Sequence, residues 1–166
     1  MNELAKMAIA AAVAAGALVV LPLAGFADDG ASPIFGVRIP QGYRDWRLIG
    51  VGREDGLGEL RGIVGNAIAV DAYETSKQPF PDGTTLVKLA WKHVMIPGLD
   101  GAFTSDAPTT VQVMVKDAAK YASTGGWGFG RFIDGKPVDE AQHMTCFGCH
   151  EAHASAHDFV FTRYGR

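Results

Sequence analysis

The feature that most constrains the fold of this 166-residue chain is the run of residues 84–94, which is the longest strand candidate in the sequence. A period of two with β-branched and aromatic members predicts a strand, and the preceding "PFPDG" is strong turn chemistry. Successive side chains of a strand point to opposite faces. One face of this strand would carry Thr85, Val87, Leu89, Trp91 and His93, and the other Leu86, Lys88 and Ala90.

Other segments of the chain continue this pattern. Strands are predicted at residues 46–51, 60–70, 84–94, 110–115, 124–132 and 159–164, helices at residues 71–77, 116–122 and 138–156, and a helical turn around Tyr43. Strands outnumber helices and short connections join them. The chain is therefore predicted to be α+β, mainly antiparallel β-sheet with a few helices packed on it. No internal repeat is visible, which predicts one domain over residues 28–166.

Residues 1–27 have the composition of a targeting signal. Lys6 precedes an alanine-rich apolar run, and "GFA" at residues 25–27 provides small residues for cleavage. The run is short for a membrane span, which needs about 20 residues, so cleavage after Ala27 is predicted rather than a retained anchor. A secreted protein without a membrane span is expected, in a compartment that permits a disulfide.

The charge pattern argues against one class of partner. The formal net charge is −3, and no block of like charges occurs after residue 27. Basic clusters are expected of a protein that binds nucleic acid or an acidic membrane surface. We therefore predict no nucleic-acid partner.

The only two cysteines of the chain, Cys146 and Cys149, lie in "MTCFGCHEAH", where His150 directly follows them. Cys-x-x-Cys-His is the attachment signature of c-type haem. Two thiols one helical turn apart suit the two vinyl groups on one side of the porphyrin, and the adjacent imidazole is then directed at the iron. The motif predicts one covalent haem c near the C-terminus, tethered by both cysteines, with His150 as the iron ligand.

Two other chemistries use cysteines at this spacing. A redox dithiol does not require the histidine, and this chain lacks the alternating helices and strands of a thioredoxin-like site. A zinc site would need His153 and His157, whose separation from the cysteines is too small for the usual finger. A haem by itself leaves the function open, because the distal pocket decides between electron carrier, gas binder and enzyme.

With these features in place, the chain resembles the cytochrome P-460 family over nearly all residues after the signal. The resemblance is carried, in order, by "IPQGYRDWRLIGV" (39–51), "LRGIVGN" (60–66), "FPDGTTLVKLAWK" (80–92), "GGWGFGRF" (125–132), "CFGCH" (146–150) and "DFVFTRY" (158–164). It implies a periplasmic homodimer whose five-coordinate haem oxidises hydroxylamine or a related small nitrogen compound and passes electrons to an external acceptor. The related cytochrome c-prime beta branch implies nitric oxide binding without turnover, and an electron-transfer cytochrome is a third hypothesis.

The resemblance also implies a role for Lys88, which matches the family's lysine bonded covalently to the porphyrin edge. Its place between Leu86 and Ala90 on one strand face agrees, because a lysine there must shift its pKa, pair with a charge or be chemically used. The alternative is a lysine whose ammonium reaches solvent at a sheet edge.

Arg61 matches a family arginine that faces the haem pocket, where a guanidinium would hold a propionate or orient a polar substrate. The alternative is a surface ion pair with Glu59. Turnover would also need a base for the substrate's protons. The sequence does not assign that role to Asp134, Asp139 or Glu140, which lie between the aromatic strand and the haem motif.

Overall fold

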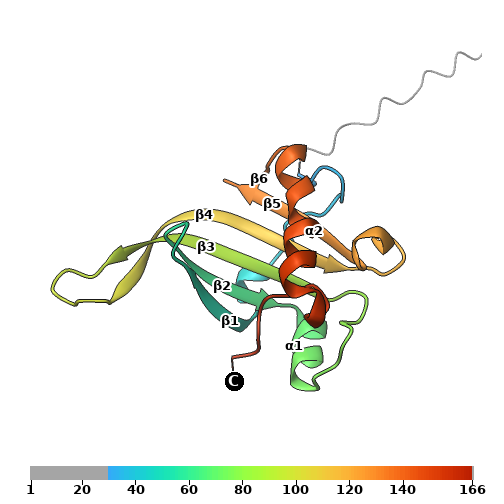
Figure 1. The fold of residues 1–166 in the computed structure, drawn as a ribbon, viewed down its shortest axis with the longest axis horizontal. Coiled ribbons are helices and arrows are strands. Elements are labelled where there is room, and N and C mark those ends of the chain that lie inside the picture. The colour runs from blue at the N-terminus through green and yellow to red at the C-terminus, as the bar shows by residue number, and fades with distance from the viewer. Residues whose placement is uncertain (1–29, 166) are drawn as a thin grey trace, which may run out of the picture.

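The computed structural model describes residues 30–165, so the predicted signal at residues 1–27 lies outside the described part. The elements are η1 (Tyr43–Asp45), β1 (Arg47–Glu54), β2 (Glu59–Gly65), α1 (Ala67–Glu74), β3 (Thr85–Met95), β4 (Phe103–Lys116), η2 (Ala122–Thr124), β5 (Trp127–Ile133), β6 (Lys136–Pro137), α2 (Glu140–Ala154) and η3 (Ser155–His157). The strands form one six-stranded antiparallel sheet in sequence order, β1 to β6. The α+β prediction is confirmed, and α2 lies across one face of the sheet (Figure 1).

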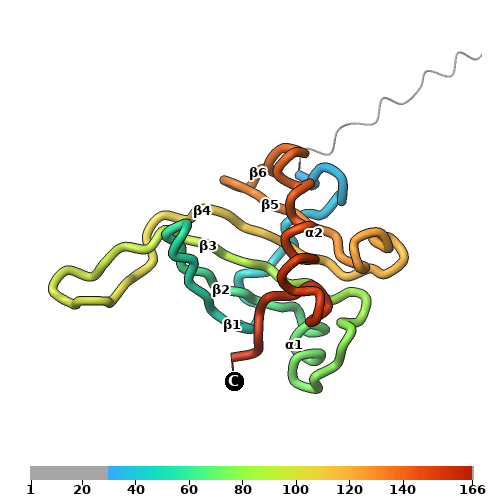
Figure 2. The backbone as a smooth tube through the Cα atoms, viewed as in Figure 1, coloured from blue at the N-terminus to red at the C-terminus, as the bar shows by residue number. Residues whose placement is uncertain are grey.

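The sheet separates two apolar clusters. The cluster on the α2 side contains Ile63, Leu86 and Phe129, with Ala69 and Ala72 of α1 packed among them. The opposite face carries the second cluster, whose buried members are Val37, Val64, Val87, Val113, Tyr121 and Phe132. Residues of the segment before β1 pack against this second cluster, and Figure 2 traces that segment into the sheet. Both faces of the central strands are therefore covered.

The boundary between β2 and α1 differs from the prediction of a strand over residues 60–70. β2 ends at Gly65 and α1 begins at Ala67. The Asn66 side chain causes the change, because its Oδ1 accepts a hydrogen bond from the Ala69 backbone N–H at 3.0 Å and caps the helix. The same oxygen accepts from the Thr85 N–H at 3.2 Å, which ties the cap to β3.

Two further predictions were wrong. Residues 116–122 do not form a helix; Lys116 ends β4, where its N–H still donates to the Thr84 carbonyl at 2.9 Å. Residues 159–164 do not form a strand. The Thr162 carbonyl accepts instead from the Tyr73 hydroxyl at 3.1 Å, so a side chain takes the place of a ladder partner.

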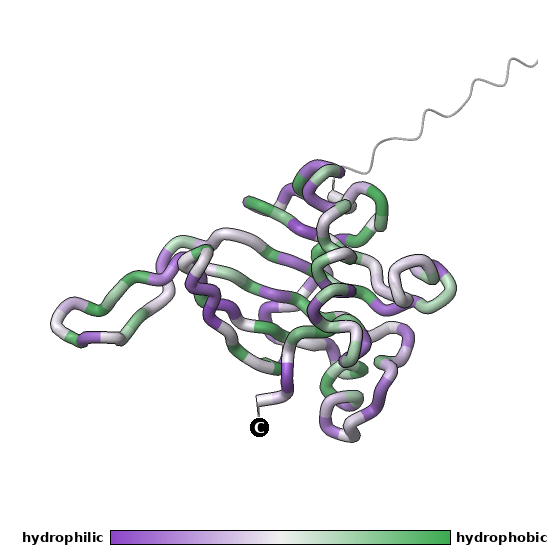
Figure 3. Tube along the Cα trace, in the orientation of Figure 1, coloured by the Kyte–Doolittle hydropathy of each residue, from purple (hydrophilic) through white to green (hydrophobic). Residues whose placement is uncertain are grey.

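The strands β3 and β4 continue beyond the rest of the sheet as a hairpin arm, residues 93–105 (Figure 1). The predicted strand at residues 110–115 missed the first part of β4, which begins at Phe103. The His93 and Phe103 rings meet edge to face within the arm, with centroids 4.7 Å apart. Val94, Met95 and Leu99 are exposed there, and green stretches alternate with white and purple ones along the arm in Figure 3.

Candidate functional site

The helix α2 holds the Cys-x-x-Cys-His motif against β5. Asp139 caps its first turn by accepting from the Gln142 N–H at 2.8 Å. The fully buried His143 joins this turn to the sheet: its Nε2 accepts from the Arg131 backbone N–H at 3.0 Å, and its Nδ1 donates to the Asp139 carbonyl at 2.9 Å. The position of the motif over the sheet is thus set one turn ahead of it.

Cys146 and Cys149 lie one turn apart on α2 and are both free thiols. Residues three apart lie on the same side of a helix, which is the spacing that two tethers to one porphyrin edge need. Cys146 is half-buried against the α2-side cluster, and burial raises the pKa of its thiol while the Arg131 charge opposes the rise. Cys149 is exposed.

His150 is held by the segment that follows its own helix. Its Nδ1 donates to the Phe159 carbonyl at 2.7 Å. A carbonyl only accepts hydrogen bonds, so Nδ1 carries the hydrogen and Nε2 keeps its lone pair. The rings of Phe129 and Phe161 contact the imidazole at centroid distances of 5.0 and 4.8 Å. Burial lowers the pKa of His150, which favours the neutral form that ligates metals.

Lys88 lies on the face of the sheet that α2 covers. It pairs with Ile63 of β2 on one side and Gln112 of β4 on the other, and Gln112 pairs in turn with Arg131 of β5. Residues directly opposite in adjacent strands share a face. Ile63 belongs to the α2-side cluster, so this cross-strand row points toward the helix.

The surroundings of Lys88 change its protonation. Burial, reinforced by the Arg61 charge and opposed by Glu59, lowers its pKa from 10.5 to about 8. The Lys88 charge acts in turn on Cys146 and on His150. Lys88 therefore lies on the sheet face that the haem motif covers, near enough for its charge to act on Cys146 and His150, and it is not a lysine at an exposed sheet edge.

Arg61 is fully engaged by carboxylates. Its Nη1 donates to Glu54 at 2.8 Å, and its Nη2 donates to Glu59 at 3.1 Å. Glu59 also accepts from the Thr109 hydroxyl at 2.7 Å. The ion pair with Glu59 considered as the alternative for Arg61 is present, but it is not a surface pair, because Glu59 is only 6% exposed. The charge of Arg61 nevertheless acts on Lys88, where it helps to lower the pKa of the lysine.

Glu59 is a buried acid near Lys88 that the sequence did not predict as a site residue. Burial alone would raise its pKa, but the hydrogen bonds from Thr109 and Arg61 outweigh burial and the pKa lies below its ordinary value. The available signal was the period of two in "ELRGI", which places Glu59 and Arg61 on the face of Ile63. The acids named from sequence, Asp134, Asp139 and Glu140, are all exposed.

The side chain of Arg131 tests whether a haem fits these residues. Its Nε is buried and has no hydrogen-bond partner within residues 30–165. Buried donors in proteins nearly always have a partner, so this atom is expected to donate to an acceptor that residues 30–165 do not supply, either a bound group or a water. A haem propionate is such an acceptor, and an arginine binds carboxylates well. Together with the free Nε2 of His150 and the two thiols, the donor set fits a haem.

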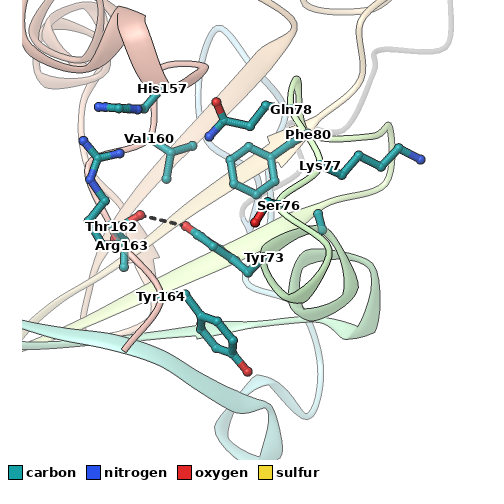
Figure 4. Close-up of a pocket in the computed structure, with 11 residues that line it drawn as sticks. Tyr73, Ser76, Lys77, Gln78, Phe80, His157, Val160, Thr162, Arg163 and Tyr164 are labelled. Atoms are coloured by element: carbon teal, nitrogen blue, oxygen red, sulfur yellow. Dashed lines mark hydrogen bonds between the residues drawn. The ribbon is translucent and has the colours of Figure 1, made fainter. Parts of the chain in front are cut away.

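A separate cleft of about 390 Å³ opens between α1 and the C-terminal segment (Figure 4). None of the five residues predicted for the site lines this cleft. The Tyr73 hydroxyl crosses it to the Thr162 carbonyl, and burial raises the Tyr73 pKa to about 12 although Arg163 opposes the rise. We therefore read the cleft as part of the packing that fixes residues 157–164.

The arrangement of the side chains argues against the two other uses of the cysteine pair, a zinc site and a redox dithiol. Within residues 30–165, no group of three or more His, Cys, Asp or Glu side chains is placed to hold a metal ion. His153 is exposed on α2, and His157 faces the separate cleft. The purely antiparallel sheet also lacks the parallel strands of a thioredoxin-like site. No helix in the described part of the chain is long and apolar enough to span a membrane.

The fold and the site define the class of protein: it has an antiparallel sheet, and its C-terminal helix presents a Cys-x-x-Cys-His motif to one face of that sheet. The family model of Cytochrome P460 matches residues 40–162. The chain belongs to this family, as the sequence resemblance predicted, and the family implies a haem cofactor. A comparison with curated proteins found no match.

Proposed function

We propose that this protein is a periplasmic c-type haem oxidoreductase that oxidises hydroxylamine or a related small nitrogen compound. Family membership supports the haem, and the Cys-x-x-Cys-His helix supports its covalent attachment. The observation that carries the proposal is the convergence of Lys88 with His150 and Cys146 on one sheet face.

The residues have separate tasks in this proposal. Cys146 and Cys149 tether the porphyrin, His150 ligates the iron through Nε2, and Arg131 binds a propionate. The bound haem would supply an iron centre that accepts electrons from the substrate and passes them to an external acceptor. Lys88 would be joined to the porphyrin edge: an N–C bond would replace one N–H of the amine and one C–H of the ring, which releases two protons and two electrons and so needs an external two-electron oxidant of the peroxide class. Only an uncharged amine can form that bond, and a pKa of about 8 makes this form accessible near neutral pH.

Protons must also leave the site, because hydroxylamine oxidation releases one proton with each electron. Glu59 stays ionised through its hydrogen bonds to Arg61 and Thr109. Its negative charge lies close enough to Lys88 to oppose the lowering of that pKa. Because the Arg61 charge acts on Lys88 more strongly than the Glu59 charge does, the pair provides no net negative charge beside Lys88, and we assign no acid–base role to Glu59.

Replacing Lys88 by arginine tests the proposal most directly. In the parent protein, mass spectrometry is expected to find the Lys88 peptide joined to the haem peptide, and the ferrous Soret band is expected to be strongly red-shifted. Lys88→Arg should retain a haem on Cys146 and Cys149, show an ordinary c-type spectrum and lose hydroxylamine turnover to background. Lys92→Arg is the matched control, because Lys92 lies on the same strand but is exposed.

The other outcomes separate the competing functions. Nitric oxide binding to the ferrous form without hydroxylamine turnover would replace the enzyme by a binder of the c-prime beta type. A six-coordinate, low-spin resting spectrum would replace it by an electron carrier. An ordinary Soret position in the parent protein would remove the Lys88 bond.

We also propose that the protein is a homodimer. The exposed Val94, Met95 and Leu99 of the hairpin arm support association, because apolar side chains gathered on a projecting element are suited to an interface. Light scattering coupled to size-exclusion chromatography is expected to give twice the chain mass. A monomer at micromolar concentration would contradict this part of the proposal.

A further inference from the structure

A buried ion pair joins the end of β4 to the segment after α2. The Lys116 Nζ contacts the two carboxylate oxygens of Asp158 at 2.8 and 2.9 Å and also donates to the Gly125 carbonyl at 2.9 Å. The exposed fractions of the two side chains are 6% for Lys116 and 10% for Asp158. Asp158 accepts a further hydrogen bond from the Phe80 N–H at 2.8 Å. The carboxylate is thereby held from two directions.

The backbone at this point is strained. Asp158 and Phe159 are consecutive non-glycine residues with positive φ, 51° and 63°. Each such residue costs about 1–2 kcal/mol, so the surrounding structure must hold the turn. The ion pair holds Asp158. The Phe159 ring packs on Gly125, where an added Cβ would lie 2.2 Å from a ring carbon.

This turn presents the carbonyl that holds the predicted iron ligand. The Phe159 N–H donates to the Ala154 carbonyl at 2.9 Å, and the Phe159 carbonyl accepts from the His150 Nδ1 at 2.7 Å. The chain of contacts therefore runs from Lys116 to Asp158, through one peptide to the Phe159 carbonyl, and then to His150. A buried ion pair adds little net stability compared with apolar residues of similar size, so its value here lies in the geometry that it imposes.

We propose that Lys116 and Asp158 are positioning residues for the proximal histidine, and that they control the donor strength of His150 toward the haem iron. The proposal rests on the proposed function only in taking His150 as that ligand. A hydrogen bond from Nδ1 to a fixed carbonyl makes the imidazole more basic at Nε2. A more basic axial ligand stabilises ferric over ferrous iron and lowers the reduction potential.

The test measures the reduction potential and the Fe–His stretching frequency of the ferrous holoprotein by resonance Raman spectroscopy. Asp158→Asn removes the charge but keeps the size and a residue that tolerates positive φ. Lys116→Gln removes the other charge. Both variants are expected to have a higher potential and a lower Fe–His frequency than the parent. Lys116→Arg keeps the charge, so its reduction potential and Fe–His frequency should lie closer to those of the parent than the values of Lys116→Gln do.

A matched control separates positioning from general stability. Val87 is fully buried in the cluster on the opposite sheet face, so Val87→Ala lowers the melting temperature without touching the turn. Its potential and Fe–His frequency should equal those of the parent. In the double variant Asp158→Asn with Lys116→Gln, the potential and the Fe–His frequency should shift no further than in either single variant, because each change breaks the same ion pair.

The inference is overturned if the Asp158 and Lys116 variants keep the parent frequency and potential, or shift no more than Val87→Ala. If Asp158→Asn does not fold, the values measured for Lys116→Gln decide whether the ion pair acts on His150. The haem content of the parent protein is measured first. Absence of a covalent haem there would remove the proposed function, whereas a normal haem with unshifted variants would remove only the positioning role.

Discussion

At the scale of the residue, the surroundings of Lys88 and His150 decide their chemistry. Burial lowers both pKa values and thereby favours a nucleophilic amine and a neutral imidazole. The same type of residue behaves differently at the end of the neighbouring strand β4: Lys116 is more deeply buried than Lys88, and its ammonium is satisfied by a carboxylate and a carbonyl. Lys88 is thus available for reaction, whereas Lys116 has a structural role.

The depressed pKa of Lys88 predicts a pH-dependent stability. We expect Lys88→Met to be more stable than the parent by about 1–3 kcal/mol below pH 8, in haem-free protein with Cys146 and Cys149 changed to alanine. Folding then buries a charged ammonium in the parent only. As the pH rises from about 8, the folded-state pKa, to 10.5, the ordinary value, the parent gains stability and the difference disappears. Urea unfolding at several pH values measures this.

The control for that experiment is Lys92→Met in the same background. Lys92 is exposed, so its replacement should change the free energy of unfolding by no more than about 0.5 kcal/mol at any of these pH values. A Lys88→Met variant less stable than the parent at pH 7 would contradict the burial of a charged amine.

At the scale of the element, single side chains set where helices begin and what they face. Asp139 and His143 fix the first turn of α2 to β5, and the haem motif follows on the same helix. Asn66 has the corresponding role between β2 and α1, where it also donates to the Gly83 carbonyl at 2.8 Å. Each cap joins a helix to a strand, so each positions an element as well as ending it.

The Asn66 cap predicts a measurable loss of stability. Asn66→Ala should lower the free energy of unfolding by about 1–2 kcal/mol, because the Ala69 N–H loses its acceptor. Asn66→Asp keeps the acceptor and loses only the donor to Gly83, so it should lose less. Chemical denaturation of the three proteins gives the comparison. Equal stability of Asn66→Ala and the parent would show that the cap is unimportant.

At the scale of the whole molecule, the sheet separates a face for chemistry from a face for support. The α2 side carries Lys88, Glu59 and the haem motif. The other side is closed by the segment before β1, where the Tyr121 hydroxyl donates to the Phe35 carbonyl at 2.9 Å. The Tyr121 ring lies directly on Gly128 of β5, so this support layer depends on a residue without a side chain.

This contact predicts that an alanine substitution will lower the stability at one glycine of the sheet and leave it almost unchanged at another. A Cβ on Gly128 would lie 2.3 Å from a Tyr121 ring atom, so Gly128→Ala should destabilise the fold by about 1–3 kcal/mol. A Cβ on Gly52 of β1 meets nothing within 4 Å, and Gly52→Ala should change stability by no more than about 0.5 kcal/mol. Thermal or urea unfolding measures both. Equal effects would contradict the packing of Tyr121 on β5.

The sequence by itself determined the α+β class, the strands around Lys88 and Trp127, and the helix that carries Cys146 and His150. These features follow from local periodicity and spacing, which neighbouring residues encode directly. Periodicity failed at Lys116 and after Asp158, where the helix and the strand that it predicted are absent. The two residues lie 42 positions apart, and a pair at that separation leaves no local signal.

Only the tertiary structure decided which side chains come together on the α2 side of the sheet. It enclosed Glu59 with Arg61 and Thr109, left the Nε of Arg131 without a partner, and directed the Phe159 carbonyl to His150. The physical reason is common to all of these: hydrogen bonds and burial depend on distances in space, whereas composition and periodicity report distances along the chain.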